Sequence, residues 1–383
     1  MTGGNERGRA GDDRRRLRLP AQHRAFIQAC LAPPDDLIAA LDECFADAEP
    51  RDVDHAAQQL FGHLYRRLDT EGLDHRTRPS LHRAYMHTWH NTQRLLFNAR
   101  PLFARIEELT GRPPLVLKGG AMASSAYYDD LGVRPVMDLD VFVERSRVPA
   151  LVDWATADGW MVSKGLDTSD IFIVHHAIDL ENGSGGAVDI HWALLVQSRD
   201  NDGDRRLADG AVDARLGDVD VRILRPTDQL FHTAAHAKPE GIRHLVDVAT
   251  IVRRHADTID WSALVDEVIG RRTITYAEQT LSQAEEAMPG TVPPAALARL
   301  RAAPRHWSDT AYHGQPMTTR REAIRRLAAD VSTRARGEPP AQRVRVARAM
   351  VRRYAQAQEM SGRDVLVTLV TRGPGELADG MPQ

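Results

Sequence analysis

The stretch from Leu115 to Glu144, LVLKGGAMASSAYYDDLGVRPVMDLDVFVE, decides the fold around which the rest of the chain is built. It follows the chain breakers Gly111 to Pro114 and opens with three apolar residues, which are typical of a short buried strand. A helix-compatible stretch, Ala121 to Tyr128, comes next, and Met137 to Val143 is a second strand candidate. The pattern predicts a strand, a glycine turn, a helix and a second strand in that order.

Lys118, Gly119 and Gly120 stand where the first strand gives way to the helix. Free backbone N–H groups and the helix dipole favour an anion at such a point, and glycine lets a phosphate come close to the backbone. The ammonium of Lys118 would neutralise part of the phosphate charge. We therefore predict that these three residues bind the phosphates of a nucleotide.

Asp138 and Asp140 alternate along the second strand candidate. Alternate residues of a strand point to the same face, so both carboxylates would share one face while Leu139 and Val141 enter the core. Mg²⁺ prefers oxygen ligands and is held in many enzymes by one or two carboxylates together with substrate phosphates. Asp138 and Asp140 are the predicted metal ligands and catalytic residues.

Asp189 is the predicted third carboxylate. The runs Ile171 to Leu180 and Ala187 to Leu195 flank a turn at Glu181 to Gly186, which predicts an antiparallel hairpin. Asp189 and His191 would share one face of its second strand, and Asp189 would bind a second ion in a two-metal mechanism. His191 is expected to have a structural role, because Mg²⁺ prefers oxygen.

Outside this segment the apolar residues recur with helical spacing. A last strand is expected at Val219 to Leu224, and a helix at Arg147 to Ala157 with Ser146 as its N-cap. We expect an α+β protein, with a small mixed or antiparallel β-sheet core flanked by N-terminal and C-terminal helical regions. The expected boundaries are a flexible tail at 1–20, a helical region at 21–111, the core at 112–225, a helical region at 226–370 and a tail at 371–383.

The composition is that of an ordinary folded protein, with 383 residues of which 42% are hydrophobic. No apolar run is long enough to span a membrane and no signal peptide opens the sequence, so we expect a cytoplasmic protein with no membrane partner. The two cysteines, Cys30 and Cys44, lack the spacing of a zinc site and are expected to be buried thiols.

Basic residues are distributed unevenly. The net charge is −3, which gives no general attraction to nucleic acid. Residues 317–353 nevertheless hold eleven arginines against three acidic residues. Such a segment could follow an RNA backbone, but the chain uses arginine freely and aromatic residues are scarce there, so nucleic-acid binding is not the favoured interpretation.

The motifs resemble the nucleotidyltransferase superfamily that includes DNA polymerase beta, and within it a bacterial family of nucleotidyltransferase family proteins. That family shows a strand ending in Leu-Lys-Gly, an arginine shortly before Asp-x-Asp, and a later Val-Asp-x-His-Trp. The matching segments here are Leu117 to Gly119, Arg134, Asp138 to Asp140, Val188 to Trp192, Leu224 to Asp228, His236 and Leu245 to Asp247, so the resemblance spans roughly residues 112 to 265.

The resemblance implies a Mg²⁺-dependent enzyme that binds a nucleoside triphosphate (NTP), with two ions expected and Mn²⁺ as the alternative metal. It would transfer the nucleoside monophosphate to a hydroxyl-type acceptor and release pyrophosphate. Arg134 would help Lys118, Gly119 and Gly120 to hold the phosphates. The chain departs from the wider superfamily in the 18 positions between Gly120 and Asp138 and in lacking a serine after the glycines.

Two alternatives remain at this point. One is NTP-dependent phosphoryl transfer by the same site to a small molecule, a peptide or an RNA end. The other is a catalytically silent module that binds a nucleotide and acts as a scaffold. The sequence identifies neither the acceptor nor the oligomeric state.

Overall fold

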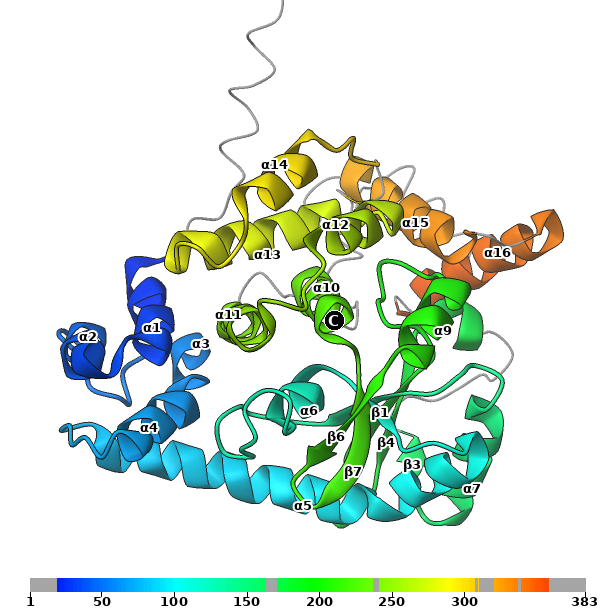
Figure 1. Ribbon diagram of the computed structural model, residues 1–383. Coiled ribbons are helices and arrows are strands. Elements are labelled where there is room, and N and C mark those ends of the chain that lie inside the picture. The colour runs from blue at the N-terminus through cyan, green and yellow to red at the C-terminus, as the bar shows by residue number, and fades with distance from the viewer. Residues whose placement is uncertain are drawn as a thin grey trace, which may run out of the picture.

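The computed structural model describes residues 19–162, 171–236, 241–306, 309, 320–336 and 339–357. Within them the chain is α+β, with a mixed sheet between two groups of helices (Figure 1). The expected tails at 1–20 and 371–383 lie outside the described residues except for Leu19, which is buried, and Pro20. None of the helices in the described part combines the length and the apolar character that a membrane-spanning helix needs.

The sheet has seven strands in the order β3-β4-β5-β2-β1-β7-β6. Their bounds are β1 Leu115–Val116, β2 Leu139–Phe142, β3 Met161–Val162, β4 Ala177–Glu181, β5 Ala187–His191, β6 Val212–Leu216 and β7 Val219–Ile223. β2 is parallel to β5, and β1 is parallel to β7, whereas the other neighbours are antiparallel. The predicted hairpin at Glu181 to Gly186 is confirmed as the β4–β5 turn.

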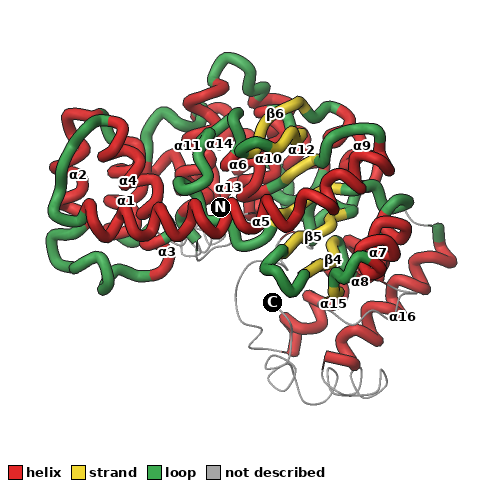
Figure 2. The backbone as a smooth tube through the Cα atoms, turned by 90° about the horizontal axis from the view of Figure 1, so that it is seen from below, coloured by secondary structure: helices red, strands yellow, loops and turns green. Residues whose placement is uncertain are grey.

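The N-terminal helices lie on one side of the sheet and along it (Figure 1). They are α1 Ala21–Leu31, the short 3-10 helix η2 Pro34–Asp36, α2 Leu37–Cys44, α3 His55–Gln58, α4 Phe61–Thr70 and α5 Arg78–Thr110. α5 runs the length of the sheet and contacts β2 and β5 (Figure 2). The predicted alternation is confirmed in the core, where Leu139, Val141, Val188 and Ile190 are buried.

The helices within and after the sheet complete the molecule. They are α6 Lys118–Ala123, α7 Val148–Ala157, α8 Ile171–Val174, α9 Asn201–Asp209, α10 Pro226–His236, α11 Arg243–His255, α12 Trp261–Gly270, α13 Ile274–Ala287, α14 Pro294–Ala302, α15 Arg320–Arg334 and α16 Pro340–Ala357. α1 packs on α11 and α13, where Gln28 Nε2 donates to the carbonyl of Ala287 at 3.0 Å. The first helix is thereby joined to the C-terminal helical region.

Several local predictions were wrong. Ile171–Val174 forms a helical turn, because four apolar residues do not distinguish a helix from a strand. The helix after the glycines begins at Lys118 and ends at Ala123, earlier than expected at both ends. Arg147 stands at the N-cap of α7 in place of Ser146, and no side chain caps that helix. The edge strands β3 and β6 were not predicted.

Gly62 of α4 provides a test of how the N-terminal helices support the core. A Cβ at Gly62 would lie 2.2 Å from the carbonyl oxygen of Gly132 and 3.0 Å from that of Val133, in the loop that leads to β2. Gly62→Ala should therefore force backbone apart and lower the free energy of unfolding by about 1–3 kcal/mol, measured by urea denaturation. Gly270→Ala is the matched control, because its Cβ would meet no heavy atom within 4 Å. Equal stability of the two variants would contradict the close packing.

Candidate active site

Three aspartates lie side by side across three neighbouring strands. In the parallel β2–β5 pair, Asp140 is the register partner of Asp189, and in the antiparallel β4–β5 pair, Asp189 is the partner of Asp179. Asp138 immediately precedes β2, two residues before Asp140. The structure thus brings the three predicted carboxylates to one region of the sheet and adds Asp179, which sequence reasoning missed.

Asp140, Asp189 and His191 form a group that could hold a metal ion. Each of them offers one ligand atom, and these atoms all lie within 4.8 Å of one another. His191 also hydrogen-bonds to Oδ1 of Asp140 through Nε2 at 2.8 Å. Two carboxylates and an imidazole are donors that divalent cations accept, so the residues present fit a metal. The shared strand face of Asp189 and His191 was the signal in the sequence that could have added His191 to the ligand set.

Lys118 forms an ion pair with Asp140, and its Nζ lies 3.5 Å from Nε2 of His191. Burial alone would raise the pKa of Asp140, but the charge of Lys118 and the hydrogen bond from His191 hold that pKa well below its ordinary value. Burial and the charge of Lys118 lower the pKa of His191. Asp140 is therefore an ionised carboxylate next to a neutral imidazole.

Asp189 has the opposite electrostatic environment. Burial, followed by the charges of Asp138, Asp179 and Asp140, raises its pKa to about 8. Burial and the charge of Asp140 also raise the pKa of Asp138. The single ammonium of Lys118 does not offset this crowding of carboxylates. Additional positive charge, such as a divalent cation supplies, would favour their ionised forms.

The backbone at Lys118 is strained. Its φ is +46°, a value that residues with a side chain rarely adopt and that costs about 1–3 kcal/mol. The preceding residue, Leu117, donates its backbone N–H to the carbonyl of Asp140 at 2.8 Å. This bond fixes the end of β1 against β2, and the unusual φ turns the chain directly into α6. Lys118 is thereby held beside Asp140.

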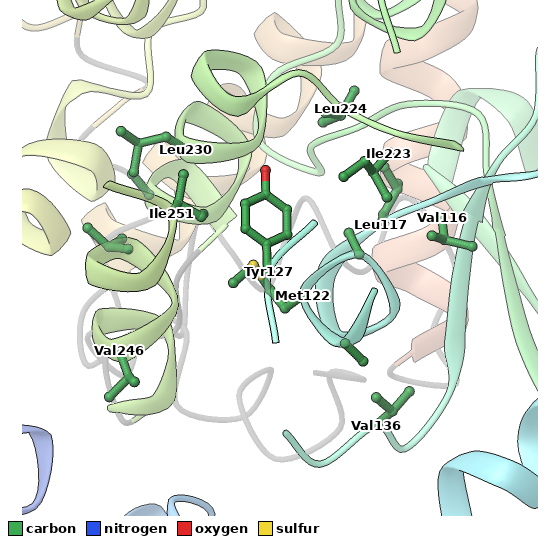
Figure 3. Packing of buried hydrophobic residues seen from close by; sticks show 14 of the residues in the cluster. Val116, Leu117, Met122, Tyr127, Val136, Ile223, Leu224, Leu230, Val246 and Ile251 are labelled. Carbon is green, nitrogen blue, oxygen red and sulfur yellow. The ribbon is translucent and has the colours of Figure 1, made fainter. Parts of the chain in front are cut away.

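α6 is anchored by buried apolar contacts. Leu117, Met122 and Val136 lie in the hydrophobic core near Tyr127 (Figure 3). The side chain of Tyr127 is fully buried. A Cβ on Gly120 would already be in contact, at 3.6 Å, with Cβ of Val116 on the sheet. α6 therefore packs closely on the strands, and a Cβ at Gly120 would make only ordinary van der Waals contacts there.

Arg134 packs over Gly119. A Cβ at Gly119 would lie only 2.7 Å from Nη1 of Arg134. The same guanidinium is paired with Asp247 of α11, with Nη2 and the nearer carboxylate oxygen 3.1 Å apart. The hydroxyl of Tyr128 also donates to Asp247 at 2.8 Å. Arg134 therefore connects the glycine turn to the C-terminal helices.

A cavity of about 590 Å³ opens beside these residues. Lys118, Gly119, Arg134, Asp138 and Asp140 line one part of it. Other parts come from both helical regions, with His55 and Gln59 from the N-terminal side and His232, His236, Arg243 and His244 from the C-terminal side. Gly120 and Asp189 are not among the lining residues, so the cavity meets the metal group from the side of Asp138 and Lys118.

Arg243 is a further cation that sequence reasoning missed. It is half-buried at the start of α11 and makes no ion pair or hydrogen bond within the described part of the chain. Burial, together with the charge of Arg134, lowers its pKa to about 10. A cation without a counter-ion on a cavity wall is a favourable contact for an anion. Nothing local in the sequence distinguishes Arg243 from the many other arginines.

Comparison with known proteins agrees with the geometry. The family model described as "Uncharacterised nucleotidyltransferase" matches residues 55–289, which is more than half of the chain and includes the whole metal group. No curated protein matches the sequence. The chain belongs to this nucleotidyltransferase family and is a transferase enzyme.

Proposed function

We propose that the protein transfers a nucleoside monophosphate from an NTP to a hydroxyl-type acceptor and releases pyrophosphate, with Mg²⁺ as the metal. The observation that carries this proposal is the pairing of Asp140 with Asp189 across parallel strands, beside Lys118 and a large cavity. A triphosphate needs cations around its phosphates, and the cavity wall supplies Lys118 and Arg243. The membership of the family supports nucleotidyl transfer as the general reaction.

Each residue has a separate task in this proposal. Asp140, Asp189 and Asp138, with His191 beside them, would hold the divalent cations, which neutralise phosphate charge and bring the two reacting oxygens together. Lys118 and Gly119 would contact the phosphates, while Gly120 lies on the buried side of α6. Asp189, whose ionised form the cations would favour, would also help to deprotonate the acceptor hydroxyl.

Arg134 has a positioning role in this scheme. Its side chain is paired with Asp247, so its contribution to phosphate binding is to fix the turn at Gly119 and to add positive charge to the wall. Arg243, which has no such partner among the described residues, would make the direct contact with a terminal phosphate. This division assigns two arginines of the same cavity to different functions.

The first test removes a metal ligand. Asp140→Asn should reduce transfer of label from an α-labelled NTP into cell-extract acceptors by about a thousandfold, roughly 4 kcal/mol of transition-state stabilisation. Asp153→Asn, at an exposed position on α7, is the matched control and should leave the rate unchanged. Activity of Asp140→Asn within tenfold of the wild type would overturn the assignment. Label that enters products only from the γ-phosphate would indicate phosphoryl transfer.

The second test concerns Arg243. Arg243→Gln should weaken binding of the Mg²⁺–NTP complex by at least tenfold, because a charge-assisted hydrogen bond contributes about 1.5–3 kcal/mol. The dissociation constant can be measured by isothermal titration calorimetry. Arg254→Gln, on the exposed side of the same helix, provides the control. An unchanged affinity in Arg243→Gln would exclude this residue from the phosphate site.

The third test uses the pKa of Asp189. In the folded chain this pKa is about 8, against 3.8 for an ordinary aspartate, so the folded state holds a proton that the unfolded state releases. The contribution of Asp189 to the free energy of unfolding is therefore complete below the pKa that this group has in the unfolded state. It is lost as the pH rises through the folded-state pKa of about 8.

Asp189→Asn removes this dependence. The variant should therefore become more stable than the metal-free wild type as the pH rises from about 5 to about 8, with no further divergence above that. Urea denaturation in the presence of a chelator measures both curves, with Asp153→Asn as the control. If the free energy of unfolding depends on pH in the same way in the wild type and in Asp189→Asn, the pKa of Asp189 is not raised in the folded chain.

A further inference from the structure

A second group of cavities lies at the other end of β2. One cavity, of about 340 Å³, is lined by Phe172, Trp192 and several arginines, and a neighbouring one of about 420 Å³ shares Arg145, Phe172 and Trp192 with it. The large cavity is lined by Asp138, just before β2, and by Asp140 within it, whereas the neighbouring one is lined by Phe142, the last residue of β2, and by Glu144 beyond it. The metal group therefore lies between two sets of cavities.

His176 connects the metal group to the second set. Its ring packs edge-on against that of His191, with centroids 5.1 Å apart, and its backbone carbonyl accepts from the N–H of Trp192 at 3.0 Å. Arg199 and Arg334, which line the smaller cavity, are close enough to affect His176 electrostatically. His176 therefore contacts His191 of the metal group and lies near two arginines of the smaller cavity.

The lining of these cavities matches a nucleotide with its phosphate. The rings of Phe172 and Trp192 meet edge to face at 4.9 Å, and the guanidinium of Arg145 lies 5.2 Å from the centre of the Phe172 ring. The buried indole Nε1 of Trp192 has no hydrogen-bond partner in the described part of the chain. Aromatic rings and arginine planes accept any base by stacking, and arginine also binds phosphate.

The charge around the two cavities is positive. The lining arginines are Arg145, Arg199, Arg205, Arg334 and Arg336, against Glu144, Asp200 and Asp202. Arg334 is ion-paired at 2.5 Å with Asp330, which does not line the cavities, so an excess of one positive charge remains. An anionic ligand is therefore favoured over a cationic or neutral one.

α16 extends this positive surface beyond the cavity. The helix contains no acidic residue, and two of its residues, Gln342 and Val346, line the smaller cavity. Arg345, Arg348 and Arg352 are exposed and fall at helical spacings of three and four, which places them along one face, hereafter the α16 stripe. Figure 2 shows α16 beside α8, which supplies Phe172. A polyanion that enters the cavity would continue along this stripe.

We propose that these cavities and the α16 stripe bind the end of a single-stranded RNA, which is the acceptor of the transferred nucleotide. This inference rests on the proposed nucleotidyl transfer. A compact small molecule could fill the cavities but would not extend along the stripe. A single-stranded RNA matches both the cavities and the stripe, because each exposed arginine of the stripe can pair with a successive phosphate of the RNA backbone.

The reaction then follows from the position of the metal group between the two substrates. A terminal ribose hydroxyl of the RNA forms a bond to the α-phosphorus of the NTP, and the bond from that phosphorus to the bridging oxygen of the β-phosphate breaks. Pyrophosphate leaves into the large cavity, and the hydroxyl proton passes to solvent water. The RNA chain becomes longer by one nucleotide.

The first experiment measures binding of the full-length protein to a fluorescent, unstructured single-stranded RNA of about ten nucleotides. The triple variant Arg345→Gln, Arg348→Gln and Arg352→Gln should bind at least tenfold more weakly. The slope of log affinity against log salt should also become shallower by about 2, since single strands give about 0.7 per phosphate contact. The matched control changes the exposed Arg51, Arg83 and Arg254 to glutamine.

Two results would overturn the RNA-binding surface. Equal loss of affinity in the stripe variant and in the control triple would show a general charge effect. The second result is that the wild type binds no RNA but binds vesicles that contain anionic lipid, and that the stripe variant loses this vesicle binding. It would assign α16 to a lipid surface instead.

The second experiment tests the cavity through Arg145, which is exposed, so its replacement should leave the fold intact. In transfer of α-labelled NTP to the RNA, Arg145→Gln should raise KM for RNA severalfold and leave kcat and KM for the NTP unchanged. Arg145→Lys should recover part of the effect, and Arg147→Gln is the neighbouring control. A free mononucleotide as acceptor should respond to Arg145→Gln but not to the stripe variant.

The outcomes separate this inference from the proposed function. Stripe-dependent RNA binding without label transfer to any acceptor would overturn nucleotidyl transfer and support the RNA surface alone. Label transfer to a small molecule or a peptide, unaffected by Arg145→Gln and by the stripe variant, would support the reaction and overturn RNA as its acceptor.

Discussion

The parallel pairing of β2 with β5 places Asp140 and Asp189 opposite each other, and the site depends on the different surroundings of these two carboxylates. Lys118 and His191 stabilise the charge of Asp140, while burial and neighbouring acids oppose that of Asp189. Two equivalent side chains thus acquire different protonation states from their surroundings. One is a permanent anion, and the other can release or accept a proton near neutral pH.

This arrangement explains why the strain at Lys118 is tolerated. A regular helix start at that residue would place its ammonium elsewhere, whereas a φ of +46° turns it beside Asp140. The surrounding fold holds the turn from several directions. The backbone N–H of Leu117 is hydrogen-bonded to β2, and Arg134 covers Gly119 while it is paired with Asp247 of α11. The C-terminal helices are therefore part of the site's support.

The sequence predicted those parts of the site that depend on neighbouring residues. Alternation in β2 and the exit of β1 into glycines follow from local geometry, so Asp138, Asp140 and Lys118 could be found without a structure. Asp179 and Arg243 could not be found from the sequence. Asp179 reaches the other carboxylates only through the register of β4 with β5, and Arg243 reaches the cavity only through the packing of α11. Ile171–Val174 was misassigned since its apolar character fits either a helix or a buried strand.

The position of the metal group between two sets of cavities also constrains the direction of the reaction. A displacement at phosphorus brings the attacking oxygen and the leaving oxygen to opposite sides, so a transferase needs separate sites on the two sides of its metals. The cavity at Asp138 carries Lys118 and Arg243, which suit a leaving pyrophosphate. The smaller cavity, beyond His191, combines the aromatic rings of Phe172 and Trp192 with arginines. The proposed acceptor, an RNA end, carries both a base and phosphates and so matches that chemistry, and the exposed arginines of α16 match the proposal that it is longer than one nucleotide.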